Sequence, residues 1–404
     1  MFRLYYFKKM LSFIKKIISI FENRVLVRMK HLDIFLTPRV RNKVRCLQEV
    51  QENILESKAR PQKLTFLCQA ECNFICEFCG FDYRTRPIKS QLTFENFKII
   101  LSHLDVNLLN KITFSGQGEP LLCHDLEKMV KYVKEHHGRI RTHIITNGAL
   151  LEGKKTDIIA HYFDLVEVSL HSVQAVTHKI ITKSNTFDKV MDNLFILRKA
   201  CPDLKIDLYF SYSMRNIDEI KKHIDLAVKL GNCGINGVYT KFYSNRNRFS
   251  RNCQKLLRPL DTNLSLFYYQ DYADQRFEEA VEYAKSLGYN NYNFCPSPFK
   301  NPYRMRKNCG NPYSQIMVNY DGTVFPCGGS ETWMFDDIAS KTLDFGNLLT
   351  SHIDEIWNNK DYQNLRQSSK GSCENRIISR CNNCTMLCYY VDSGNIFETH
   401  FIDQ

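Results

Sequence analysis

The feature that most constrains the fold is a regular alternation of short apolar runs with amphipathic runs between residues 63 and 243. Short β-branched runs indicate strands, and apolar residues spaced three or four apart indicate helices. The predicted strands are 63–67, 111–114, 140–145, 165–170, 205–212 and 237–242. The predicted helices are 93–104, 125–135, 154–162, 186–200 and 217–230, with Gly231 after the last as a C-cap. Repeated strand–helix units give parallel strands with right-handed crossovers, so we expect an α/β protein with a partial (β/α)6 TIM-like barrel.

Three cysteines, Cys72, Cys76 and Cys79, follow the first predicted strand with C-x3-C-x2-C spacing. Three thiols on one short loop cannot all pair as disulfides, but they can converge on a metal. Structural metal sites normally use four ligands, so three local thiolates indicate a metal with one open coordination position. The alternative is a zinc knuckle whose fourth ligand lies elsewhere, for example Cys68.

Further motifs stand at the ends of later strands, where barrels of this class place their active sites. The run Phe-Ser-Gly-Gln-Gly-Glu-Pro ends the second strand, and its Gly116 and Gly118 allow close backbone approach and positive φ, while Glu119 offers a carboxylate. Asn147 follows the third strand in Thr-Asn-Gly, and Ser169 ends the fourth in Ser-Leu-His-Ser. Each motif taken alone is an ordinary turn.

The cysteine loop, with its aromatic residue before the third cysteine, resembles the signature of the radical S-adenosylmethionine (SAM) superfamily. The resemblance implies that the three cysteines hold a catalytic [4Fe-4S] cluster whose fourth iron is chelated by SAM, with Phe78 near the adenine. The glycine run resembles the family's G-G-E element, which binds the SAM amino group, although this chain reads G-Q-G-E. Asn147 and Ser169 match positions that contact the ribose and carboxylate of SAM. His171 stands where many members carry Asp, and we do not expect it to be catalytic.

A second cysteine constellation lies near the carboxyl terminus, with Cys309 and Cys327 around a predicted hairpin turn and Cys381 and Cys384 in a later C-x2-C pair. Such pairs can assemble a four-thiolate site. Residues 343–348 and 354–357 resemble the GN-(x)n-IW stretch of SPASM and twitch domains, the auxiliary-cluster modules of radical SAM enzymes. The resemblance implies a second [4Fe-4S] cluster on these four cysteines, and a structural zinc site is the alternative. Cys373 and Cys388 receive no role.

The expected organisation has five parts: a basic amphipathic helical extension (1–58), a radical SAM core barrel (59–245), a connecting segment (246–304), a small cysteine-rich SPASM/twitch domain (305–392) and a tail (393–404). A second helix is predicted over 39–58, a later one over 277–287, and a linker over 289–303. Sixteen cysteines in a 404-residue chain, several in closely spaced pairs, indicate metal sites in a reducing compartment, so we expect a cytoplasmic protein. Cysteines outside these spacings are expected to be small buried hydrophobes; they are Cys46, Cys68, Cys123, Cys201, Cys233, Cys253 and Cys295.

The net charge of +12 is concentrated at the amino end, where residues 1–60 hold 14 Lys and Arg against 5 Asp and Glu. Residues 1–21 have the pattern of a basic amphipathic helix, and Lys15 and Lys16 interrupt it too early for a membrane span. This helix either packs on the protein's own barrel, which we favour, or makes a peripheral membrane contact through residues 1–23. A basic arm on a nearly neutral remainder gives no reason to expect a nucleic-acid partner.

The function implied by the resemblance is reductive cleavage of SAM to methionine and a 5′-deoxyadenosyl radical, which abstracts hydrogen from a substrate. The electron would come from a flavodoxin- or ferredoxin-like donor. The substrate is a small molecule or a peptide, and oxidation of a sugar- or cyclitol-like alcohol is favoured. The alternatives are a peptide-modifying maturase and a non-catalytic protein that binds a cluster or zinc.

Overall fold

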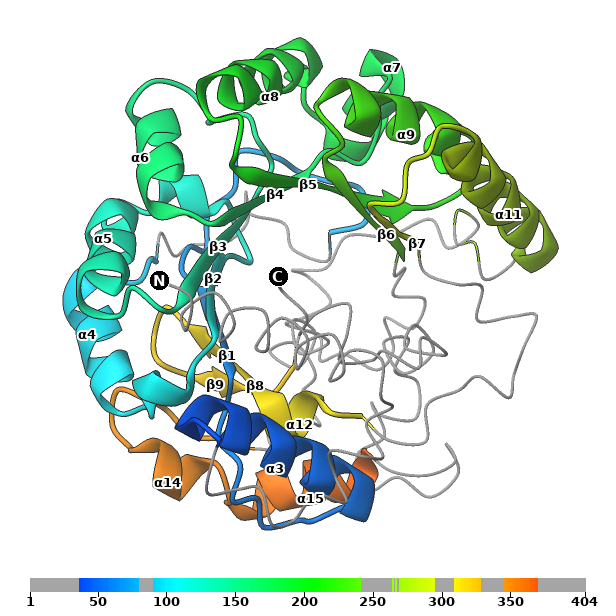
Figure 1. Cartoon of the computed structure of the whole chain (residues 1–404). Coiled ribbons are helices and arrows are strands. Elements are labelled where there is room, and N and C mark those ends of the chain that lie inside the picture. Colours follow the sequence, from blue (N-terminus) through cyan, green and yellow to red (C-terminus); the bar gives the residue numbers. More distant parts are fainter. Residues whose placement is uncertain are drawn as a thin grey trace, which may run out of the picture.

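A nine-stranded sheet forms an open arc, with helices on its outer side (Figure 1). The computed structural model describes residues 36–79, 90–240, 264, 266, 269–294, 309–327 and 344–369. The strand order is β7-β6-β5-β4-β3-β2-β1-β8-β9. All neighbouring pairs are parallel except β8 and β9, which form an antiparallel hairpin. This parallel arc with outer helices confirms the predicted partial barrel.

The elements have the following bounds. The strands are β1 (Lys63–Leu67), β2 (Lys111–Ser115), β3 (Arg141–Thr146), β4 (Leu165–Ser169), β5 (Lys205–Tyr212), β6 (Gly234–Tyr239), β7 (Tyr292–Phe294), β8 (Gln315–Asn319) and β9 (Val324–Phe325). The helices are α3 (Pro38–Glu52), α4 (Phe94–Ser102), α5 (Leu126–His136), α6 (Lys154–Tyr162), α7 (Ala175–Thr182), α8 (Phe187–Ala200), α9 (Ile220–Lys229), α11 (Gln270–Ser286), α12 (Asn311–Ser314), α14 (Ile353–Ile356) and α15 (Lys360–Ser368). Short 3-10 turns are η2 (Val106–Leu108), η3 (Pro120–Leu122) and η4 (Ile217–Glu219).

Several predicted boundaries need correction. The helix predicted over 39–58 ends at Glu52, because Asn53 takes the left-handed conformation that stops a helix (φ 56°). Helix α11 begins at Gln270 rather than 277, since its first two turns are too polar to show a helical apolar pattern. The predicted linker 289–303 contains β7, a three-residue strand paired with β6. Helix α7 was not predicted.

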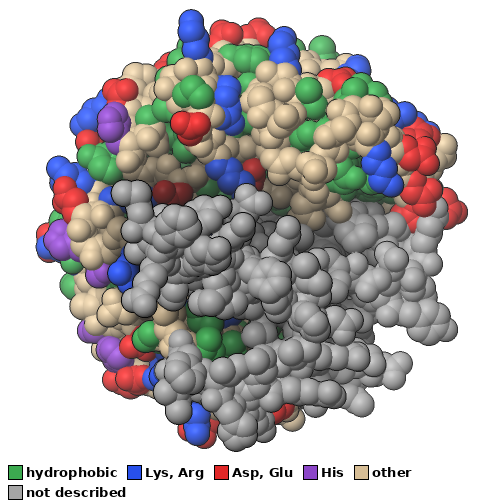
Figure 2. Space-filling model, in the orientation of Figure 1, with side chains coloured by type: hydrophobic (Ala, Val, Ile, Leu, Met, Phe, Trp, Pro, Cys, Tyr) green, Lys and Arg blue, Asp and Glu red, His purple; other side chains and the backbone are tan. Residues whose placement is uncertain are grey.

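The two faces of the sheet differ in polarity. Alternate residues on the outer face are apolar and pack against the helices; for example, the Phe66 ring lies 5.1 Å from that of Phe97 and 5.9 Å from that of Phe114. The intervening residues point to the inner side and include Lys111, Glu167 and other polar groups. On the helices, charges of both signs are spread around the ring, and Asp and Glu gather over α11 (Figure 2).

The carboxyl-terminal segment extends the barrel sheet directly. Strand β8 pairs in parallel with β1, with Lys63 opposite Gln315, so the sheet has no break between the predicted barrel and the predicted SPASM/twitch domain. The hairpin turn predicted at 319–322 is confirmed, with Gly322 at φ 83° and its N–H donating to Asn319 O. Helices α3, α12, α14 and α15 cover the outside of this edge (Figure 1).

Some predictions concern segments outside the described residues. These are the amphipathic helix at 1–21, the first part of the connecting segment at 246–263, and the cysteines Cys253, Cys295, Cys373, Cys381, Cys384 and Cys388. Four of the other cysteines predicted to be small core residues are buried, namely Cys46, Cys68, Cys123 and Cys233, whereas Cys201 is half-buried. No helix within the described ranges has the length and apolar run that crossing a membrane requires.

Candidate active site

The cysteine loop, residues 72–79, leaves the carboxyl end of β1 and is held by α7. The backbone N–H groups of Ile75 and Glu77 donate to Thr182 O (3.1 Å) and Ile181 O (2.7 Å), carbonyls in the last turn of α7. Within the loop, Cys79 N–H donates to Cys76 O at 3.1 Å. These bonds fix the loop backbone against a helix that follows β4, so the loop does not depend on local turn propensity alone.

The three thiols of this loop are half-buried. Cys72 Sγ accepts from Phe74 N–H (3.4 Å) and lies 3.9 Å from the Asn147 side-chain nitrogen. Burial, with the Glu119 carboxylate nearby, raises the pKa of Cys72 to about 12. This thiol is therefore protonated at neutral pH, and binding iron would release its proton.

The donor set fits an iron–sulfur cluster better than the zinc knuckle. Cys68, the suggested fourth ligand, is fully buried in the core, and its thiol donates to Ser115 O at 3.1 Å. The remaining donors of the loop are three cysteine thiols, and a [4Fe-4S] cluster prefers cysteine ligands, each on a separate iron.

The glycine run, residues 116–119, lies directly against the start of the cysteine loop. Gly118 N–H donates to Gln69 O (3.0 Å), and Glu119 N–H donates to Glu71 O (2.7 Å), one residue before Cys72. A Cβ on Gly118 would lie 1.9 Å from Glu71 O, and one on Gly116 would lie 2.5 Å from Gly118 O. The expectation of positive φ was wrong, since neither glycine adopts it. Both are required because the backbones approach so closely.

Replacing Gly118 by alanine is therefore expected to separate the glycine run from the cysteine loop. We expect 5′-deoxyadenosine formation to fall by about a hundredfold, because misplacement of reacting groups by about 1 Å has that effect. The assay is chromatography of the anaerobic reaction with dithionite and SAM. Gly153→Ala is the control, because nothing lies within 4 Å of its Cβ position and only its φ of 53° is strained. Equal losses in both variants would contradict the steric explanation.

Glu119 connects the glycine run to the end of β3. Its buried carboxylate accepts from Thr146 Oγ1 (2.6 Å) and from the backbone N–H groups of Leu121 (3.0 Å) and Asn147 (2.8 Å). Burial raises the pKa of this carboxyl group, and these hydrogen bonds oppose the shift. The Glu119 carboxylate thus fixes the positions of Thr146, Leu121 and Asn147 through these three hydrogen bonds.

Asn147 in turn connects β3 to the cysteine loop. Its side-chain nitrogen donates to Asn73 Oδ1 at 2.7 Å, and its Oδ1 accepts from Ala149 N–H at 3.1 Å. The sequence motifs did not identify Asn73 or Thr146 as site residues, because their contribution is to orient another residue. Both lie inside the motifs, Asn73 between Cys72 and Cys76 and Thr146 in Thr-Asn-Gly, but neither was given a role.

Phe78 and His171 face each other across the site. Their rings lie edge to face with centroids 4.7 Å apart. His171 has a positive φ of 63°, and its Nδ1 accepts from Ser211 N–H at 3.2 Å, so the ring proton sits on Nε2. Burial lowers the pKa of His171 to about 3, which keeps the ring neutral. His171 therefore packs against Phe78 as a neutral ring. Ser169 is half-buried at the end of β4.

The inner face of the barrel below these motifs is polar. Asn236 Nδ2 donates to Glu167 Oε2 (2.9 Å) and lies 3.4 Å from Asp207 Oδ2, so one amide bridges two carboxyl groups. Burial and then Asp207 raise the pKa of Glu167 to about 7, against the opposing charge of Lys111. Interiors of TIM barrels are typically filled by branched apolar residues, so this interior is unusually suited to a polar ligand.

A Glu167→Gln variant is expected to lose part of the pH dependence of stability. A carboxyl group whose folded pKa is raised binds more protons when folded, so its contribution to stability falls as pH rises from about 4.5 through about 7. The variant should be more stable than wild type at pH 8 by on the order of 2 kcal/mol, and the gain should vanish near pH 4.5. Urea unfolding across pH 4.5–8 measures this. Glu152→Gln serves as the control, because Glu152 is exposed. If the stability of Glu167→Gln depended on pH as that of wild type does, the raised pKa of Glu167 would be refuted.

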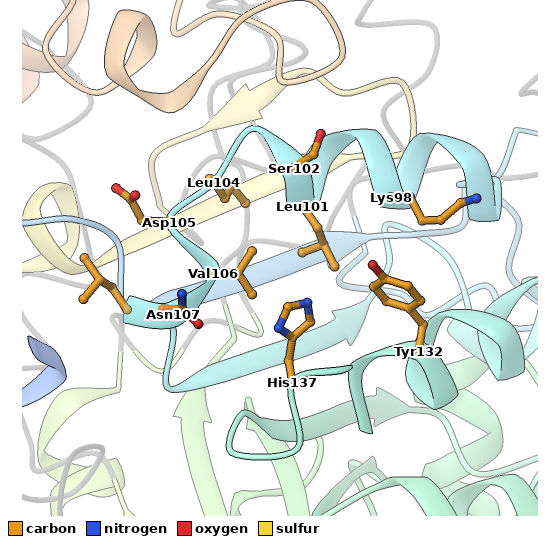
Figure 3. A pocket seen from close by; sticks show the side chains of 10 residues that line it. Lys98, Leu101, Ser102, Leu104, Asp105, Val106, Asn107, Tyr132 and His137 are labelled. Atoms are coloured by element: carbon orange, nitrogen blue, oxygen red, sulfur yellow. The ribbon is translucent and has the colours of Figure 1, made fainter. Parts of the chain in front are cut away.

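A separate surface pocket lies at the opposite end of the strands. It has a volume of about 390 Å³ and is lined by residues in and next to α4, η2 and α5, including Lys98, Asp105, Tyr132 and His137 (Figure 3). The lining residues at 104–108 precede the start of β2, whereas the cysteine loop follows the end of β1. None of the predicted site residues lines this pocket.

The auxiliary cysteines are described only in part. Cys309 and Cys327 are half-buried beside the β8–β9 hairpin, and Cys309 N–H donates to Ser369 O at 2.9 Å. Trp357, from the Ile-Trp pair, is fully buried and donates from its ring nitrogen to Ala59 O at 2.7 Å. This stretch thus fastens the hairpin edge to the segment that leads into β1.

Comparison with known proteins agrees with this geometry. Residues 67–227 match the family model described as the radical SAM superfamily, and residues 309–385 match SPASM, an iron-sulfur cluster-binding domain. The chain is 28% identical over 179 residues to the S-adenosylmethionine-dependent nucleotide dehydratase RSAD2 of Oncorhynchus mykiss, covering 43% of this chain and 50% of the relative. It is 30% identical over 172 residues to the "Probable GTP 3′,8-cyclase" of Saccharolobus islandicus, covering 40% and 51%. The chain thus spans about half the length of these relatives.

Solved structures share the fold over most of the chain. SuiB of Streptococcus suis bound to S-adenosylmethionine aligns with a TM-score of 0.62 and 16% identity, covering 88% of this chain and 81% of that one. The complex of SuiB with its precursor peptide SuiA aligns with a TM-score of 0.60 and 16% identity, covering 87% and 75%. The chain therefore contains a radical SAM superfamily region at residues 67–227 followed by a SPASM domain at residues 309–385, a combination that implies SAM and iron–sulfur clusters as cofactors.

Proposed function

We propose that this enzyme reductively cleaves SAM and uses the resulting radical to abstract hydrogen from a polar substrate. The observation that carries the proposal is the junction of three motifs at one end of the strands. The glycine run pairs with the backbone before Cys72, Glu119 holds Asn147, and Asn147 reaches back to the cysteine loop. These hydrogen bonds hold three short segments, which are distant in sequence, together in one site.

Each predicted residue has a proposed role. Cys72, Cys76 and Cys79 hold the catalytic [4Fe-4S] cluster, which when bound supplies the electron that splits SAM into methionine and a 5′-deoxyadenosyl radical. Gly116, Gly118 and Glu119 receive the SAM amino group, Asn147 and Ser169 its ribose and carboxylate, and Phe78 its adenine. The protein's contribution is to orient SAM and to keep water away from the reacting carbon.

The polar inner face favours a substrate rich in hydrogen-bonding groups. Glu167, Asp207 and Asn236 present carboxyl and amide groups to the barrel interior, which match the hydroxyls of a sugar- or cyclitol-like alcohol. We propose oxidation of such an alcohol as the reaction. The second candidate is peptide modification, prompted by the SuiB complex with its precursor peptide.

The remaining assignments follow from this proposal. Cys309, Cys327, Cys381 and Cys384 would hold an auxiliary [4Fe-4S] cluster that accepts the electron released by substrate oxidation. The domain limits of 59–245 and 305–392 and a reducing cytoplasmic setting are proposed on the same basis. A flavodoxin- or ferredoxin-like protein would supply the electron for SAM cleavage.

Deuterium transfer tests the proposal and separates the two substrate classes. Reconstituted protein, dithionite and SAM are incubated without oxygen with deuterated sugars and cyclitols, or with deuterated peptides, and 5′-deoxyadenosine is analysed by mass spectrometry. Deuterium arriving from the polyols supports the first candidate. Deuterium arriving only from peptides supports the second and overturns the first. Absence of 5′-deoxyadenosine in every sample would overturn both.

A further inference from the structure

Helix α7 exposes two large apolar side chains on one face. Val176 is 73% exposed and Ile180 is 37% exposed, and they lie one helical turn apart. Single exposed apolar residues are common on protein surfaces, so exposure alone assigns no role to this pair. Its position does.

The end of α7 is in direct contact with the cysteine loop. The carbonyls of Ile181 and Thr182 accept hydrogen bonds from Glu77 and Ile75, with no intervening element. A protein that docks on α7 is therefore bound to the helix that directly contacts the loop carrying Cys76 and Cys79. Short separation between redox centres is what an electron-transfer complex must provide.

The charge around the apolar pair is basic. Lys179 on α7 and Lys183, the residue that caps its carboxyl end, are both exposed. Lys183 and Arg215 flank Glu77, at N–O distances of 3.9 and 3.4 Å. Two cations thus flank one carboxylate, and Lys179 adds a third exposed cation on α7. By contrast, Asp and Glu gather over α11, the outer helix that packs on α9 (Figure 2), so an acidic partner would be repelled there and attracted at α7.

We infer that the α7 surface, consisting of Val176, Lys179, Ile180, Lys183 and Arg215, docks the acidic face of a small one-electron donor protein. One electron passes from the donor's reduced flavin or iron–sulfur centre, which is oxidised, to the cluster held by the cysteine loop, which is reduced. The inference rests on the proposed function. An apolar centre inside a charged rim is the usual anatomy of a transient protein interface.

The test compares Val176→Glu and Lys179→Glu with Ile196→Glu, a 58% exposed control on α8. Reconstituted enzyme is driven either by reduced acidic flavodoxin or by dithionite, and calorimetry measures flavodoxin affinity. We expect at least a tenfold loss of flavodoxin-driven 5′-deoxyadenosine formation and of affinity in both α7 variants. Dithionite-driven rates, and every value for Ile196→Glu, should stay within twofold of wild type.

Two results would overturn the inference. One is flavodoxin affinity within twofold of wild type in Lys179→Glu, which alters only an exposed charge and so decides the matter even if Val176→Glu perturbs folding. The other is an equal loss in Ile196→Glu. Failure of wild type to cleave SAM with dithionite would instead overturn the proposed function, and calorimetry would still report whether flavodoxin binds at α7.

Discussion

Replacing Cys76 by alanine should reduce 5′-deoxyadenosine formation to below about 1% of the wild-type rate, because the loop then offers two thiolates where the cluster needs three. Glu77 and Ile75, which fasten the loop to α7, are untouched, so the fold should persist. Iron content and circular dichroism of the purified variant separate loss of the cluster from loss of folding.

Cys201→Ala is the matched control for this prediction. Cys201 is also a half-buried thiol, but it lies at the end of α8 and outside the cysteine loop. It should keep both iron content and activity. Loss of activity in Cys201→Ala, or its retention in Cys76→Ala, would contradict the assignment of the ligands.

Replacing Arg366 by methionine is expected to cause the largest loss of stability. Arg366 is fully buried on α15, where burial lowers its pKa to about 10 and leaves it charged at neutral pH. Its guanidinium donates to Leu55 O (2.8 Å), Pro312 O (3.2 Å), Trp357 O (2.7 Å) and Asn358 Oδ1 (2.8 Å). It also lies 4.9 to 5.4 Å from the ring centres of Trp357, Tyr313 and Tyr362.

Methionine fills similar space but removes the arginine donor from the carbonyls of Leu55, Pro312 and Trp357, while Asn358 Oδ1 keeps its bond from Ser57 N–H (2.9 Å). We expect a loss of about 3–5 kcal/mol in the free energy of unfolding, measured by urea denaturation. Arg139→Met is the control, because Arg139 is exposed and should change stability by less than about 0.5 kcal/mol. Similar unfolding midpoints for wild type and Arg366→Met would refute the view that this arginine joins the two ends of the described chain.

The sequence predicted well those parts of the fold that have a local signal. Strands β1 and β5 and helix α6 were predicted to the residue, because continuous apolar runs or helical spacing mark them. Helix α7 escaped prediction because it is only eight residues long and rich in β-branched residues. Pairing of β8 with β1 could not be predicted, since it joins residues about 250 apart and leaves no local pattern.

In the candidate site, too, only the features with a local sequence signal could be predicted. The motif residues could be named from spacing and resemblance, yet their contacts depend on tertiary structure. Nothing local to Glu119 indicates that its carboxylate holds Thr146 and Asn147, or that its neighbour Gly118 is needed because Glu71 passes so close. His171 likewise has its positive φ of 63° at the centre of a γ-turn closed by Ser172 N–H donating to Leu170 O (2.8 Å), and its carbonyl accepts from Asn216 Nδ2 (2.6 Å), a contact that the sequence does not reveal.

The central claim is that the loop of Cys72, Cys76 and Cys79 holds an iron–sulfur cluster that cleaves SAM. The most direct measurement is the iron and sulfide content of anaerobically reconstituted wild type and of a variant with all three cysteines replaced by alanine, alongside 5′-deoxyadenosine formation. We predict about eight irons in wild type and about four in the variant, as for two [4Fe-4S] clusters reduced to one, with SAM cleavage abolished. Equal iron content in the two proteins, or SAM cleavage that survives in the variant, would contradict the account.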